Sequence, residues 1–101
     1  MVSEFIQNRI NLAHDMIDQK GFEEAVELLK NLKNRIHEQN IIPEINIFEQ
    51  EHDQKLKEMI NKIDTSSDDP LRKQHNKYEQ WKRYAQSYLK FYDNITKKHD
   101  I

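Results

Sequence analysis

Glu49 and His52 form a Glu-x-x-His pair. This spacing puts a carboxylate and an imidazole on one helical face, where they can ligate iron in a helical bundle. A di-iron centre needs a second such pair, but the residues three positions before the other histidines are Asn11, Asn34, Arg72 and Thr96. His52 also falls on an apolar stripe. We therefore expect a partly buried, hydrogen-bonded histidine, with no metal and no cofactor.

Nucleophilic catalysis finds no support in the sequence. Cysteine is absent, which also excludes disulfides and thiolate zinc sites. The serines fall in capping, loop or helical contexts without a histidine nearby in sequence. They are Ser3, Ser66, Ser67 and Ser87. We expect no catalytic residues and a protein that is not an enzyme.

Aromatic and basic residues alternate along the segment 77–93, which holds six of the nine aromatic residues and four basic ones. Aromatic faces that stack on bases, together with cations that follow phosphates, are typical of single-strand nucleic-acid binding. The residues that offer this chemistry are Tyr78, Trp81, Tyr84, Tyr88, Lys77, Lys82, Arg83 and Lys90. Nucleic-acid binding is therefore one interpretation of this segment.

The spacing of the same residues favours a second interpretation. Two series repeat every seven residues, as in the apolar seam of packed helices. The first is Leu71, Tyr78, Ala85 and Tyr92, and the second is Gln74, Trp81, Tyr88 and Ile95. A seam of this kind turns most of the rings toward other helices, and a pI near 6.2 is low for a dedicated nucleic-acid binder. Nucleic-acid binding stays the alternative to a helix-bundle core.

The composition indicates one small all-α domain over residues 1–101. A single glycine and two prolines disfavour tight turns and glycine-rich phosphate loops. With 36% apolar and 34% charged residues the core must be thin, so a partner or a homodimer could supply part of the stability. Residues 1–70 carry 8 basic and 15 acidic side chains, a charge of −7, while residues 71–101 carry 8 and 3, a charge of +5.

Four helices are predicted, forming a small antiparallel bundle. Apolar residues at steps of three and four predict helices over 3–19, 22–39, 44–64 and 70–97. Gly21 is expected to end the first helix in a left-handed conformation. Pro43 is expected to keep Ile42 out of helical geometry. Asp69 is expected to cap the last helix, with Pro70 at its first position.

The segment 9–36 resembles a single tetratricopeptide unit. Leu12 and Ala13 match that family's first helix, and Ala25, Leu29 and, less closely, Leu32 match the second. The early tryptophan position of the family falls on Arg9, and no second copy follows. This resemblance implies a helical hairpin and a role in protein or peptide binding.

The remaining rings and cations of the last helix predict a binding face. Tyr and Trp are enriched at interface hot spots because apolar rings there carry polar atoms. We expect partner binding through Tyr84, Phe91, Tyr92, Lys82, Arg83 and Lys90. The expected partner is an acidic or amphipathic protein or a second copy of this chain, with nucleic acid the alternative.

The cellular setting is expected to be the cytoplasm. No export signal and no segment of roughly 18 apolar residues is present, so we expect no membrane association. The chain has twelve Lys, twelve Ile and nine Asn, which is typical of an AT-rich genome such as that of a bacterium or phage. A small regulator, inhibitor, immunity-type protein or chaperone-like adaptor fits these expectations.

Overall fold

The computed structural model describes residues 3–36 and 40–99. Their helices are α1 (Glu4–Asp18), α2 (Phe22–Leu32), the 3-10 turn η1 (Lys33–Arg35), α3 (Ile42–Asp64) and α4 (Pro70–Lys98). The described part contains no strand. The predicted all-α bundle of four helices is confirmed.

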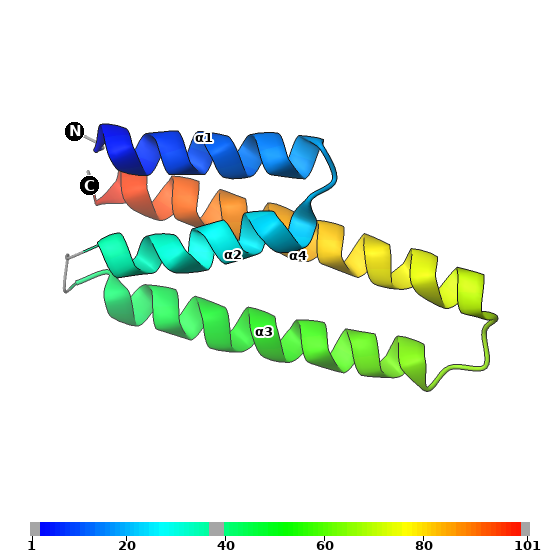
Figure 1. The fold of residues 1–101 in the computed structure, drawn as a ribbon. Coiled ribbons are helices and arrows are strands. Elements are labelled where there is room, and N and C mark those ends of the chain that lie inside the picture. The colour runs from blue at the N-terminus through cyan, green and yellow to red at the C-terminus, as the bar shows by residue number, and fades with distance from the viewer. Residues whose placement is uncertain (1–2, 37–39, 100–101) are drawn as a thin grey trace.

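The helix α4 is the centre of the bundle, because it packs against α1, α2 and α3. The helices α1 and α2 form one antiparallel hairpin, and α3 and α4 form a second, longer one (Figure 1). The start of α1 and the end of α4 lie at the same end of the molecule. One continuous core joins the two hairpins.

The core draws on the predicted apolar stripes. Each buried apolar side chain contributes about 1.5 to 3 kcal/mol relative to an exposed one. The fully buried side chains of largest volume are Tyr88, Tyr92, Leu29, Ile41, Ile45 and Thr96. Ile36 and Ile41 are buried on either side of the connection between η1 and α3, so the apolar residues near this connection close one end of the core.

The second hairpin extends beyond the first (Figure 1). We call its outer part, residues 60–64 of α3 and 70–77 of α4, the distal arm. The first hairpin ends where Phe22 meets Tyr78, with ring centres 5.2 Å apart. Near the tip, Lys77 pairs with Asp64, and α3 and α4 are the only described helices present there. Neither α1 nor α2 therefore packs against the predicted seam at this end of α4. Leu71 is 78% exposed and Gln74 is exposed.

The turn between α1 and α2 differs from the prediction in one residue. Lys20 has φ 66°, whereas Gly21 has φ −87°. The Lys20 amide donates to the Ile17 carbonyl and the Gly21 amide to the Met16 carbonyl, at 2.9 and 2.7 Å. This pair of bonds is a Schellman motif, which requires the left-handed residue one position earlier than Gly21.

Two helix boundaries also differ from the prediction. The α-helical part of α2 ends at Leu32 instead of near Gln39, because η1 tightens the last turn and Ile36 adopts an extended conformation. Residues 37–39 lie outside the described part. The helix α3 begins at Ile42, so Pro43 falls in its first turn, where a missing amide costs no hydrogen bond. The cap of α4 is confirmed, since Asp69 Oδ1 accepts from the Arg72 amide at 2.9 Å.

Candidate binding groove

A groove of about 500 Å³ runs between α3 and α4. It is lined by His52, Lys55, Leu56, Met59, Gln80, Arg83, Tyr84, Gln86, Ser87 and Lys90. Two carboxylates of α3 are absent from this lining: Asp53, which pairs with Lys30 of α2, and Glu49, which pairs with Lys33 of η1. They lie on another flank of α3, so the groove opens on the side of the second hairpin that faces away from α2.

The floor of the groove is apolar. Leu56 and Met59 are half-buried, and Tyr84 is only 7% exposed. The Tyr84 hydroxyl donates to the Asp53 carboxylate, which fixes the ring between the two helices. The Trp81 ring meets Tyr84 edge to face at 5.5 Å between centres. These contacts give the floor a fixed shape.

An aromatic stack that includes His52 lies at one end of the groove. The Phe48 ring lies 3.8 Å from the His52 ring and 3.9 Å from the Phe91 ring, centre to centre. His52 Nδ1 is 3.1 Å from the Phe48 carbonyl oxygen, so Nδ1 carries a proton and donates it. His52 is thus half-buried and hydrogen-bonded, as the sequence predicted.

The rims of the groove are basic. Lys55 lies on the α3 rim, Arg83 and Lys90 lie on the α4 rim, and no lining residue is acidic. Arg83 and Lys90 are seven residues apart, or about 10.5 Å along the helix axis. An apolar floor between basic rims can hold an amphipathic ligand that carries negative charge.

A polar layer between α2, α3 and α4 supports the groove from behind. Lys30 pairs with Asp53, and Lys33 pairs with Glu49, each at 3.3 Å. Lys30 Nζ also lies 6.0 Å from the Tyr84 ring centre. These contacts tie α2 to the two helices that carry the groove.

Two tyrosines beside this layer are unlike Tyr84. Tyr88 and Tyr92 are completely buried, and their hydroxyls have no hydrogen-bond partner among the described residues. Burial, followed by the negative charge of Glu49, raises the pKa of both phenols above the ordinary range. Both therefore stay neutral in the folded protein under physiological conditions.

A second, smaller groove of about 390 Å³ lies on the other side of α4, against α1. Gln86 and Lys90 line both grooves. The smaller groove has carboxylates from Asp18 and Asp93 beside Lys90, so its charge is mixed. Of these two grooves among the described residues, the one between α3 and α4 combines an apolar floor with rims of a single charge.

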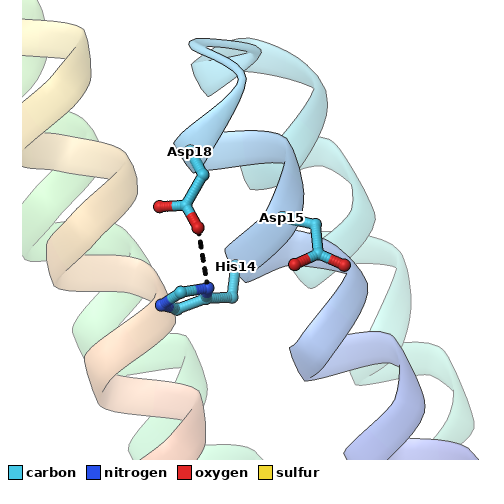
Figure 2. Close-up of side chains that lie close together, drawn as sticks. All are labelled: His14, Asp15 and Asp18. Atoms are coloured by element: carbon cyan, nitrogen blue, oxygen red, sulfur yellow. Dashed lines mark ion pairs between the residues drawn. The ribbon is translucent and has the colours of Figure 1, made fainter.

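Three side chains of α1 offer metal-ligating atoms close together. His14, Asp15 and Asp18 have such atoms within 4.8 Å of one another, and all three residues are exposed. His14 is turned toward Asp18, with Nδ1 3.3 Å from Oδ2, while no ion pair is drawn from these two residues to Asp15 (Figure 2). An exposed pair of this kind on one helix is worth at most about 1 kcal/mol. We interpret the cluster as a surface ion pair.

The groove brings together three of the six residues predicted to bind a partner. Arg83, Tyr84 and Lys90 line it, whereas Lys82 does not. The prediction that Tyr92 is part of an exposed face is wrong, because its ring is completely buried between helices. Tyr84 is also buried, and only its groove side is accessible. Phe91 is half-buried in the stack with Phe48.

The burial of the rings limits the stacking on bases that the nucleic-acid alternative requires. Tyr84 and Tyr88 are buried, so neither offers a free face for a base. Tyr78 and Trp81 are half-buried and make edge-to-face contacts with Phe22 and Tyr84. The heptad spacing thus correctly placed Tyr88 and Tyr92 in the core.

Sequence reasoning missed the α3 half of the groove. Lys55, Leu56 and Met59 were not predicted as site residues, although Leu56 and Met59 belong to the apolar stripe of that helix. The sequence did contain one signal, which is that the four predicted helices differ in length. The shorter helices cannot cover the whole apolar stripes of the longer ones. The position of Lys55 opposite Arg83 follows only from the packing of α3 on α4.

Comparison with known proteins adds no relative: no family model matches the chain, and neither a curated protein nor a solved structure is significantly similar to it. The tetratricopeptide resemblance of residues 9–36 stays a prediction. Among the described residues no helix is long and apolar enough to cross a membrane. The fold defines a small all-α bundle with one basic, apolar-floored groove.

Proposed function

We propose that this protein is a non-enzymatic interaction module that binds another protein in the groove between α3 and α4. The observation that carries the proposal is the pairing of an apolar floor with three rim cations and no lining carboxylate. Regulators, inhibitors, immunity-type proteins and adaptors act through sites of this kind, and a cytoplasmic setting is part of the proposal.

The rigidity of the groove also supports binding. The Tyr84–Asp53 hydrogen bond and the stack of His52, Phe48 and Phe91 hold the floor and one end in place without a ligand. A preformed site loses less conformational entropy on binding, which raises affinity for a given contact area. Arg and aromatic residues in such a pocket are typical interface hot spots.

Photo-crosslinking tests the proposal. A photoreactive amino acid at Ser87, inside the groove, should trap a discrete protein, whereas the same group at the exposed Gln50 of α3, outside it, should not. The trapped protein is then purified and its affinity measured directly. Charge reversal by Arg83→Glu and Lys90→Glu should weaken that affinity, and an unchanged affinity would contradict the proposal.

Two other occupants give different results in the same experiment. A second copy of the chain would appear as a crosslinked dimer and as a concentration-dependent mass by light scattering. A nucleic acid would appear as a nuclease-sensitive adduct with strong salt dependence. Either result would replace the proposed protein partner.

A further inference from the structure

The positions of the cations along the groove restrict what kind of segment fits it. Arg83 and Lys90 lie on one rim, and Lys55 lies on the opposite rim. Two cations seven residues apart on α4 share one side of that helix, because seven residues make nearly two full turns. They therefore form a row parallel to the helix axis, about 10.5 Å long.

The apolar floor runs in the same direction as this row. On α3 the lining extends from His52 to Met59, which are again seven positions apart. Leu56 and Tyr84 lie within this length, between the two rims. The site is thus a straight trough about two helical turns long, bounded by one cation on one side and two on the other.

A third helix matches this trough. Helices pack into the depression between two others at small crossing angles, with apolar residues at i, i+3 and i+7 toward the floor. Acidic residues seven apart on the flank of such a helix have the same axial spacing as Arg83 and Lys90. An extended strand covers the same distance in about three residues, and its side chains alternate between faces.

Resting on the proposed function, we infer that the ligand is an acidic amphipathic helix that lies along α4 in this groove. It carries two acidic residues seven apart on the flank toward Arg83 and Lys90, and a third acidic residue on the flank toward Lys55. Apolar residues at i, i+3 and i+7 lie between the flanks and contact Leu56, Met59 and Tyr84. The contact with α3 is about two turns long, because the α3 side of the groove is lined only from His52 to Met59.

The inference is tested with a synthetic peptide of about fifteen residues that has this pattern. A matched control peptide has the same composition, net charge and helix content, but its acidic residues are moved to the face opposite the apolar row. Binding to the full chain is measured by calorimetry, and the methyl signals of Leu56 and Met59 are followed by NMR. We expect the patterned peptide to bind at least tenfold more tightly than the control and to shift both methyl signals.

Protein variants locate the binding. Arg83→Glu and Lys90→Glu should each weaken binding of the patterned peptide by about tenfold or more, with a smaller effect as salt is raised. Arg72→Glu changes another exposed arginine of α4 that lies outside the groove, so it should have little effect. Urea unfolding of each variant confirms that the fold is retained.

The outcomes separate this inference from the proposed function. The inferred seven-residue spacing of the acidic residues is wrong if the two peptides bind equally. It is also wrong if Arg72→Glu weakens binding as much as Arg83→Glu does. If no peptide binds while a protein trapped at Ser87 does, the helical ligand is wrong and the groove as a protein-binding site stands. If neither binds, both are wrong.

Discussion

The hydroxyl of Tyr84 donates a hydrogen bond to the carboxylate of Asp53, a residue 31 positions earlier in the chain. Asp53 also pairs with Lys30, so a single carboxylate joins three helices. Tyr84→Phe removes the hydroxyl from this arrangement and keeps the ring. We expect it to lower the free energy of unfolding by about 1 to 2 kcal/mol, because hydrogen bonds to charged groups are among the stronger ones. Urea denaturation measures this change.

Tyr92→Phe is the matched control for that change. Tyr92 lies about two turns further along the same helix, is buried more completely than Tyr84, and its hydroxyl has no hydrogen-bond partner among the described residues. Removing an unpaired buried hydroxyl should leave stability unchanged or raise it slightly. If both substitutions cost the same, the hydrogen bond to Asp53 is not the cause of the loss.

Stability should fall in alkaline solution because of Tyr88 and Tyr92. Burial and the charge of Glu49 raise the pKa of both phenols in the folded state, while in the unfolded chain they titrate near the ordinary value of 10.0. Above that pH the unfolded state loses protons that the folded state keeps, so stability is full below about pH 10 and declines above it. The decline is at most about 1.4 kcal/mol per pH unit for each tyrosine.

Urea unfolding from about pH 8 to about pH 11.5 measures this dependence. The double variant Tyr88→Phe, Tyr92→Phe should show a clearly flatter curve, since it lacks both groups. Tyrosinate absorbance provides an independent measurement. Ionisation of all four tyrosines near pH 10 in the folded protein would contradict the prediction.

Lys20→Gly should stabilise the protein. Lys20 has φ 66°, a conformation that costs a residue with a Cβ about 1 to 2 kcal/mol and glycine almost nothing. The greater freedom of glycine in the unfolded chain offsets part of this gain, which leaves about 0.5 to 1 kcal/mol. Thermal unfolding measures the gain. Gln19→Gly, at a neighbouring residue with negative φ, should instead destabilise.

The distal arm should open more readily than the rest of the bundle. Its residues lie beyond the contact of Phe22 with Tyr78, and Leu71 is largely exposed. Few buried contacts allow local opening at a free energy below that of global unfolding. Hydrogen exchange should therefore be faster for amides of 60–64 and 72–76 than for the second half of α4. Equal protection throughout α4 would show that the arm does not open independently.

Trp81 distinguishes the two interpretations of the aromatic segment. It is the only tryptophan, is half-buried and packs edge to face on Tyr84. We expect blue-shifted emission that single-stranded oligonucleotides do not quench at low salt. Quenching that weakens as salt rises would instead indicate base stacking and favour nucleic-acid binding.

The helices and most of the core could be predicted from the sequence, because periodic apolar residues and a cap such as Asp69 act locally. Other features depend on neighbours that lie far apart in the chain. The seven-residue repeat predicts the same role for Leu71 and Tyr92, yet Leu71 is exposed and Tyr92 is buried. The helices α1 and α2 do not extend along the first turns of α4, where Leu71 lies. The left-handed residue fell at Lys20 because the register of the Schellman hydrogen bonds, and not the glycine, determines its place.

The candidate site was only half predictable for the same reason. Arg83 and Lys90 are recognisable as cations outside the seam, but the groove exists only where α3 lies against α4. Lys55 is 28 positions from Arg83 in the sequence, and no local pattern relates them. Tyr84 was predicted to bind a partner, whereas its bond to Asp53 required the packed structure.

The central position of α4 has a consequence for biosynthesis. The three helices that it contacts emerge from the ribosome before it, and the sides of their apolar stripes that face α4 have no partner until α4 follows. The hydrophobic core therefore closes only after the nascent chain has been extended through about residue 96, where Ile95 and Thr96 complete it. Until then the emerging chain exposes the apolar surface that α4 later covers.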